Sequence, residues 1–405
     1  MDTQGIGRRI AYWRGRRRLT QADFGTLMGR SRRWVQDIEG GHRQADPRLS
    51  VLEQAAQVLK VRLETLLSDE AMRSDRPCVD AAELAEIRAT LYRHDILTGS
   101  CASAGPPELA TLRRNIAYGW TAFQASNYSP LGRVLPPLLV GANQAAAHST
   151  GAARDEAFVL LALTYQLAAA AATKFEDGDL AWHASDRAVV AAERSGDPVA
   201  RAGAARHLSD ALFHRGRGQE AVALATDTAA DLEGDLRARG EEGLSVLGML
   251  YLKATMAAAH REDHRAVPGL LHEAESVAQR LGGDRNALWT AFGPTNVRIH
   301  RVSAMVRLHE GRAAVAEAER IGRSALDALP RERRALHRVD AARGLLQSGR
   351  RPEAVSALLE AEEEAAEEVR CRAKSRKLVE ELTLLGAGSA EGRLRGLAAR
   401  CGLPA

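Results

Sequence analysis

A short motif recurs in the second half of the chain, and its spacing constrains the fold more than any other feature. Gly216–Val222 reads GRGQEAV and Gly349–Val355 reads GRRPEAV, with a degenerate copy at Arg261–Val267 and a shortened one at Gly311–Val315. The Ala-Val pairs begin at positions 221, 266, 314 and 354, so neighbouring copies lie 45, 48 and 40 residues apart. Periods of this length are typical of stacked supersecondary units.

Each copy follows an apolar stripe of helical period and opens another helix, as paired antiparallel helices require. A glycine can end the first helix, and a small alanine in the first turn of the second lets the backbones approach. Aromatic residues make up only 4% of the chain, which favours helix packing over β-sandwiches or barrels. We therefore expect an all-α protein. Further expected helices are Pro107–Asn127, Leu131–His148, Arg154–Lys174 and Asp179–Ser195, with Ser375–Leu385 and Ala390–Cys401 capping the stack.

These helix pairs resemble tetratricopeptide repeats, although their periods exceed the usual length of about 34 residues. The resemblance implies that residues 80–405 form a right-handed α-solenoid. In such a superhelix, the first helix of each pair lines a concave groove.

Charge divides the chain into two parts. Residues 1–67 hold 13 basic and 7 acidic residues, a net of +6, whereas the remainder holds 43 and 45, a net of −2. A basic N-terminal sixth suggests a module that binds a polyanion, although a solvated arginine-rich face has the same composition. Residues 68–79 show no sustained helical stripe and contain Pro77, so we expect a linker there.

Five short helices are expected between Ile6 and Leu67. Two of them are joined by a tight turn at Gly29, and the second, Arg32–Glu39, is short and basic at its start. This is the helix-turn-helix pattern. Caps at Thr20, Ser31 and Asp46, a first-turn Pro47 and stops at Gly29 and Gly40 mark the helix ends.

Many positions of this region match a known family at once: Thr20-Gln21, Gly29-Arg30-Ser31, Ile38-Glu39-Gly40, Arg43, Pro47, Leu52, Ala55 and Leu59. On these positions, residues 6–67 are similar to the lambda-repressor-like (Xre) DNA-binding domain, a five-helix fold. Two departures from the family are Gly25, where alanine is usual, and Ala45-Asp46, which lengthen a loop. The resemblance also implies a buried bridge between Arg14 and Glu39.

A recognition helix reads bases with its N-terminal residues. Here these are Arg32, Arg33 and Gln36, with Asp37 beside them. Arginine bonds guanine in a bidentate manner and glutamine bonds adenine likewise. Trp34 either contacts the DNA backbone or packs within the domain.

Two further side chains are candidates for phosphate contacts. Gln21 begins the second helix, and the N-terminal amides of that helix would hold a phosphate together with Gln21. Arg43 lies in the loop that follows Arg32–Glu39. The expected partner is therefore double-stranded DNA.

The groove of the repeat region offers candidate ligand residues. Asparagine donates and accepts hydrogen bonds, which suits a peptide backbone. Asn296 opens a helix after an unusual aromatic, Gly and Pro run, and His300 lies one turn on. Arg206, Asp210 and Tyr251 in the middle repeats are expected to project into the same groove. For each of these five residues, surface exposure or helix packing is the alternative.

Motifs for catalysis or cofactors are missing. The sequence has no G-x-S-x-G, phosphate-binding loop or dinucleotide fingerprint, and the His260/His264 pair lacks the H-E-x-x-H order and a third ligand. We therefore expect a protein that is not an enzyme and binds no metal or cofactor. The apolar stretch Ala157–Thr173 is shorter than a membrane span, so we expect a buried helix. Cysteines are few and scattered, which suits a reducing compartment, so we expect a cytoplasmic protein.

A basic reader joined to such repeats resembles the bacterial quorum-sensing receptors of the RRNPP type. The resemblance implies a transcriptional regulator whose repeat domain binds a peptide or small-molecule signal. A dimer is expected because one module contacts too few bases for specificity. The alternative hypothesis is a docking platform that recruits a partner protein to DNA.

Overall fold

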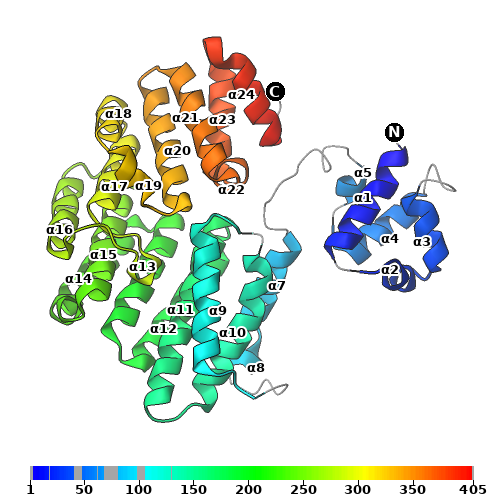
Figure 1. Ribbon diagram of the computed structural model, residues 1–405, viewed down its shortest axis with the longest axis horizontal. Coiled ribbons are helices and arrows are strands. Elements are labelled where there is room, and N and C mark those ends of the chain that lie inside the picture. Colours follow the sequence, from blue (N-terminus) through cyan, green and yellow to red (C-terminus); the bar gives the residue numbers. More distant parts are fainter. Residues whose placement is uncertain are drawn as a thin grey trace. The chain divides into compact units, whose positions relative to one another are not determined.

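The computed structural model describes residues 3–17, 19–40, 48–61, 63–67, 81–97, 105–128 and 130–403. Regular structure in these residues is helical throughout, with no strand, so the predicted all-α class is confirmed. The chain forms two compact units, Met1–Arg76 and Pro77–Ala405 (Figure 1). The division falls within 68–79, the segment predicted to be a linker, which lies outside the described residues.

The N-terminal unit is a small helical domain built around one apolar core. Side chains such as Ile10, Phe24, Val35 and Leu59 meet in this core. Its helices are α1 Thr3–Arg16, α2 Gln21–Leu27, α3 Arg32–Glu39, α4 Leu49–Leu59 and α5 Leu63–Leu67 (Figure 1).

The turn between α2 and α3 follows the predicted caps. Thr20 and Asp23 form a reciprocal capping box at the start of α2, and the Ser31 hydroxyl accepts a hydrogen bond from the Trp34 amide at 3.2 Å. Gly29 has a φ of +63°, the left-handed conformation that ends α2. A Cβ atom on Gly25 would lie 2.9 Å from the Arg30 carbonyl oxygen, so the glycine fits the close approach of this turn.

The start of α4 differs from its prediction. The structure begins this helix at Leu49, because Arg48 before it has non-helical φ and ψ of −56° and 143°. The expected cap, Asp46-Pro47, lies outside the described residues.

The C-terminal unit consists of consecutive antiparallel helices stacked side by side, as a helical repeat would be (Figure 1). Its first helices are α7 Ala81–Leu91, α8 His94–Leu97, α9 Leu109–Gln124, α10 Leu131–His148, α11 Ala152–Lys174 and α12 Gly178–Ser195. The middle ones are α13 Pro198–His214, α14 Gly218–Ala238, α15 Gly240–His260, α16 Ala266–Leu281, the 3₁₀ turn η1 Ala287–Trp289, α17 Pro294–Arg307, α18 Gly311–Glu319 and α19 Arg323–Asp327. The last are α20 Arg331–Gln347, α21 Arg351–Glu364, α22 Ala366–Arg370, α23 Ala373–Leu385, η2 Gly388–Ala390 and α24 Glu391–Arg400.

The repeated motif lies where the sequence places it. Its four copies open α14, α16, α18 and α21, and each of these helices packs on the one before it in its pair. The motif alanines Ala221, Ala314 and Ala354 are fully buried at these contacts. Paired helices joined at the motif are therefore confirmed.

The turn before each motif helix contains a residue in the left-handed conformation. Gly216 and Gly349 both have a φ of +77°, and in the two less regular copies the residues are Glu262 at +56° and His309 at +60°. Non-glycine residues adopt this conformation at a steric cost. The turn geometry is therefore kept where the glycine is lost.

Helix α11 is the buried centre of the first repeats. Among the described helices it is long and apolar enough to cross a membrane, but 78% of its most apolar window is buried inside the unit. This agrees with the prediction of a helix covered on most sides.

The first and last repeats touch each other across the inner side of the stack. Lys174 at the end of α11 lies 2.5 Å from a Glu332 oxygen and 2.7 Å from a Glu368 oxygen, joining positions 158 and 194 residues apart. The Tyr128 amide donates to a Glu367 oxygen at 3.0 Å, and α9 contacts α20 (Figure 1). The stack therefore closes on itself.

Candidate nucleic-acid interface and ligand cavity

Helix α3 buries one side and exposes the other. Val35 and Ile38 point into the domain core, whereas Arg32, Arg33 and Gln36 are exposed and Asp37 is half-buried. The spacing of these four polar residues puts them on adjoining turns of the same helix. The side chains predicted to read bases are thus on the open surface of the domain.

A buried bridge orients α3 against the two helices before it. Arg14 donates from Nε and Nη2 to the Glu39 carboxylate at 2.5 and 3.0 Å, and from Nη1 to the Leu19 carbonyl at 2.8 Å. The hydrogen bond to Glu39 raises the pKa of Arg14. This is the pair that the family resemblance implies.

Gln21 joins the same bridge. Its Nε2 donates to a Glu39 oxygen at 2.9 Å, so Gln21 helps to hold α3 in place. Its contact with phosphate stays a prediction, and Arg43, the other phosphate candidate, lies outside the described residues.

Trp34 packs at the edge of the domain core. Its side chain is half-buried against the core cluster, and the Arg30 guanidinium lies 5.7 Å from its ring centroid. The packing alternative for Trp34 therefore agrees with the structure.

The inner side of the C-terminal unit holds a cavity of about 460 Å³. Residues of α9, α11, α12, α13, α15, α17, α20 and α23 line it, together with Trp289 of η1. Arg206, Asp210 and His300, three of the five predicted ligand residues, are part of this lining. The structure thus brings these three together from α13 and α17.

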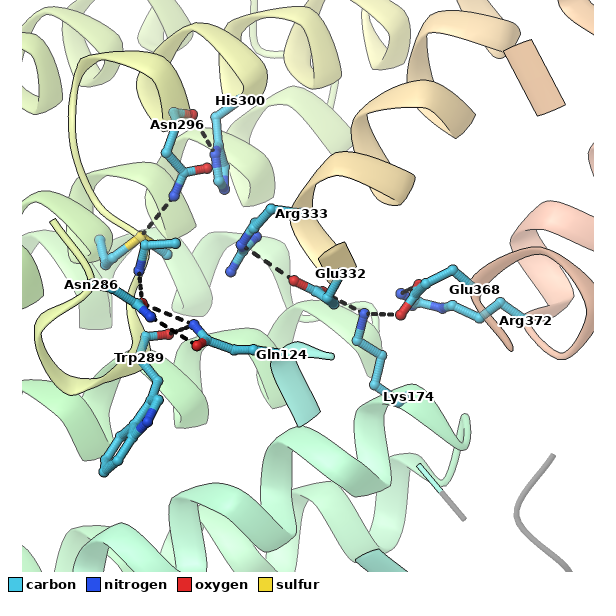
Figure 2. Close-up of polar contacts among 12 residues, drawn as sticks. Gln124, Lys174, Asn286, Trp289, Asn296, His300, Glu332, Arg333, Glu368 and Arg372 are labelled. Atoms are coloured by element: carbon cyan, nitrogen blue, oxygen red, sulfur yellow. Dashed lines mark hydrogen bonds and ion pairs between the residues drawn. The ribbon is translucent and has the colours of Figure 1, made fainter. Parts of the chain in front are cut away.

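The two other ligand candidates do not line the cavity, and their prediction is wrong in this respect. Asn296 is fully buried behind His300, with its Nδ2 donating to Met249 Sδ at 3.7 Å and its carbonyl oxygen bonded to His300 Nδ1 at 2.9 Å (Figure 2). Tyr251 precedes the lining residue Lys253 by two positions, about 200° around the helix, and packs against the core cluster of α14–α16.

Sequence reasoning missed most of the charged lining. Lys253, Arg333 and Asp340 all face the cavity, as does Trp289. A signal for part of this set is present in Arg331–Asp340, RERRALHRVD, because a helix in a stacked pair cannot keep so many charged residues on its solvent side.

Two ion pairs join side chains that line the cavity. Lys253 Nζ lies 2.7 Å from Asp210 Oδ1, and Lys374 Nζ lies 2.5 Å from Asp340 Oδ1. Burial alone would raise the pKa of Asp210, but Lys253 holds it well below its usual range. Burial lowers the pKa of Lys374 to about 8, although Asp340 opposes the shift.

Five charged side chains at one end of the cavity are linked by consecutive ion pairs. Figure 2 shows Arg333, Glu332, Lys174, Glu368 and Arg372 joined in this order by ion pairs. Burial opposes ionisation of Glu332, yet Lys174 lowers its pKa to about 2.

A second hollow of about 470 Å³ lies between α18, α20 and α21. Five of its six charged side chains are paired with one another: Arg338 with Glu360 at 3.4 Å, and Arg350 with Glu353 at 3.2 Å and with Glu319 at 3.4 Å. Among the described residues, no three His, Cys, Asp or Glu side chains converge as metal ligands would. The cavity with Arg206 is therefore the candidate ligand site.

In four histidines of the C-terminal unit, His207, His214, His300 and His337, burial lowers the pKa and so favours the neutral ring. Burial lowers the pKa of His300 to about 3, with Arg333, Lys253 and Arg307 adding to the shift. Burial also lowers the pKa of His207, and the positive charge of Arg206 adds to this shift.

Mild acid is expected to destabilise the C-terminal unit. The unfolded chain protonates its histidines near pH 6.5, whereas the folded unit keeps these rings neutral, so protons favour unfolding. Between about pH 7 and about pH 5, the neutral ring of His300 costs roughly 2 kcal/mol of stability. Melting temperatures across this range are expected to fall less steeply for His300→Gln than for His264→Gln, a change at an exposed ring. If the melting temperature fell equally with pH in the two variants, the buried ring of His300 would not be the cause of the acid sensitivity.

A family of helix-turn-helix domains matches residues 6–68 of the chain. No curated protein matches the chain. The matched residues contain the capped α2, the turn at Gly29 and α3. The chain therefore consists of an N-terminal helix-turn-helix domain, which suggests DNA binding, followed by a long all-helical unit.

Proposed function

We propose that this protein is a dimeric, sequence-specific transcriptional regulator whose helical unit binds a signal molecule and thereby controls DNA binding. It acts in the cytoplasm, catalyses no reaction and needs no cofactor. The paired helices and their repeated motif support a tetratricopeptide-like unit of the kind found in RRNPP receptors.

The observation that carries the DNA-binding part is the surface of α3. Arg32, Arg33 and Gln36 are exposed there, and the Arg14–Glu39 bridge with Gln21 fixes the helix that bears them. A rigid helix with exposed arginine and glutamine near its N-terminus matches the donor and acceptor pattern of the major groove. Arg32 and Arg33 then select guanine, and Gln36 selects adenine.

Signal control is supported by the cavity of the C-terminal unit. Its volume of about 460 Å³ is within the range of small-molecule sites. Dimerisation is supported by the small size of the helix-turn-helix domain, because one such domain contacts only a few bases.

Selection of genomic DNA fragments by the full-length protein tests the proposal. We expect enrichment of an inverted repeat whose half-sites are spaced by whole helical turns, bound with a steep salt dependence. Enrichment of a single half-site would contradict the dimer, and no enrichment would contradict sequence-specific binding. Capture of one stoichiometric protein partner, with DNA binding insensitive to small molecules, would instead favour the docking platform.

A further inference from the structure

Arg206 is a buried cation that makes no ion-pair contact within the described residues, although the nearby Asp210 carboxylate attracts it. Its side chain lines the cavity and is 5% exposed. Nη2 donates to His207 Nε2 at 2.8 Å, and Nε has no hydrogen-bond partner. A buried guanidinium without an anion carries a large desolvation cost. The fold therefore maintains an unfavourable charge at this position.

Three of the four carboxylates in the cavity lining are committed to other cations, and the fourth, Glu176, accepts a hydrogen bond from the Ala373 amide at 2.8 Å. Asp210 pairs with Lys253, and Glu332 pairs with Lys174. Asp340 pairs with Lys374 and also accepts a hydrogen bond from Ser303. Arg372 in the lining pairs with Glu368, but these pairs leave Arg206 without a carboxylate in direct contact.

Two more guanidinium groups of the lining lack a full carboxylate partner. Arg333 lies beside Arg206 and reaches only one Glu332 oxygen, at 3.5 Å, while Lys174 occupies the other. Arg307 donates to the backbone oxygen of Ser303 at 3.2 Å. Both side chains line the cavity with Arg206.

The charge of the lining is consequently positive. It contains seven basic and four acidic side chains, and its histidines are neutral because burial lowers their pKa. Burial, together with Arg333, lowers the pKa of Arg206 to about 10, so its guanidinium remains charged near neutral pH. Enclosed positive charge with low-dielectric walls attracts an anion strongly.

An aromatic wall adjoins these arginines. Trp120 stacks on Trp289 with ring centroids 5.7 Å apart and planes 8° apart. Gln124 fixes the loop that carries Trp289, because it donates to the Asn286 side chain at 2.9 Å and to the Trp289 carbonyl at 3.0 Å (Figure 2). Phe123 also lines this side of the cavity. The cavity thus offers a cationic end and a flat apolar side.

We propose that the cavity binds a small organic anion, with its carboxylate or phosphate monoester at Arg206 and Arg333 and a flat apolar group against the wall of Trp120 and Trp289. This inference rests on the proposed function, since it names the chemical class of the signal. The anion supplies the partner that Arg206 lacks, and the cavity volume of about 460 Å³ suits a molecule of drug-like size.

Titrations of the full-length protein with paired probes test the charge requirement. Indole-3-acetate and phenyl phosphate present the two acidic groups on a flat ring, indole-3-acetamide is the uncharged counterpart, and inorganic phosphate lacks the ring. We expect both aromatic acids to raise the melting temperature and to release or take up heat in a calorimetric titration, with little effect of the amide. The stronger of the two acids identifies which group the site prefers.

Arginine variants locate the binding. Arg206→Gln and Arg333→Gln are each expected to weaken the aromatic acids roughly ten- to a hundredfold, as loss of a charge-assisted hydrogen bond does. Arg312→Gln, at an exposed residue outside the cavity lining, is expected to bind like the wild type. Equal binding by Arg206→Gln, equal binding of acid and amide, or no response to any probe would overturn the proposal.

Stability without ligand gives an independent readout. If Arg206 serves a ligand, Arg206→Met removes an uncompensated charge and the unliganded protein melts at the same or a higher temperature. A lower melting temperature would show a structural arginine instead. Fragment selection is run in parallel: selected DNA with no anion response overturns only this inference, whereas an anion response with no selected DNA overturns only the proposed regulator.

Discussion

Replacing Arg32 and Arg33 together by alanine is expected to weaken binding to the selected DNA site by roughly a hundredfold or more. Each lost base contact of this type costs about 1–3 kcal/mol. Both side chains are exposed on α3, so the domain keeps its fold. A gel-shift titration with full-length protein at fixed salt measures the effect, and the melting curve verifies the fold.

The control for this pair removes the same charge elsewhere. Arg133 and Arg312 are exposed residues of the C-terminal unit, and their double alanine variant is expected to bind the site as the wild type does. If the Arg32/Arg33 variant also retained full affinity, α3 would not be the recognition helix. If it lost affinity equally for unrelated DNA, its arginines would contact phosphates rather than bases.

The second large effect is expected at the junction of the first and last repeats. Lys174→Met leaves Glu332 and Glu368 without their shared ammonium group, although these carboxylate side chains are only 6% and 1% exposed. Removing one member of such a buried cluster lowers the free energy of unfolding by about 3–5 kcal/mol. The lost contacts of the Lys174 ammonium with the Phe123 and Tyr128 rings add to the effect. Urea unfolding of the full-length protein at neutral pH measures it.

Two further variants test whether the lost ion pairs cause this loss of stability. Lys377→Met removes an exposed lysine of α23 and is expected to change stability by less than about 0.5 kcal/mol. Glu332→Gln in the Lys174→Met background removes one of the two carboxylates that lose the Lys174 ammonium group, and it is expected to restore part of the stability. A Lys174→Met protein as stable as Lys377→Met would show that the ion pairs contribute nothing to closure of the stack.

Local signals were sufficient to predict the helix-turn-helix domain. Thr20, Ser31 and Gly29 fix the ends of α2 and α3 through side-chain caps and a left-handed turn, all of which depend on neighbouring residues only. The starts of α14 and α21 follow from the repeated motif for the same reason. Such signals are readable in a sequence because they do not depend on distant contacts.

The cavity was only partly predictable, because its composition depends on contacts between distant helices. Arg206 and His300 were identified, but Arg333 faces the same space only because the stack closes and brings α20 to α9. Tyr251 does not line the cavity because its position around α15 points it toward the core cluster. Asn296 does not line the cavity because it is fully buried. Helical phase and depth of this kind are set by packing, which one sequence does not display.

The contact of α11 with α20 and α22 also restricts how such a chain can change its length. In an open array each unit touches only its neighbours, so units are gained or lost at the ends without harm to the rest. Here the Lys174 side chain must meet Glu332 and Glu368, and adding or deleting one helix pair would carry them out of reach. The number of pairs is therefore fixed by geometry, and the chain must bring distant segments together before it gains their stabilisation, which slows folding.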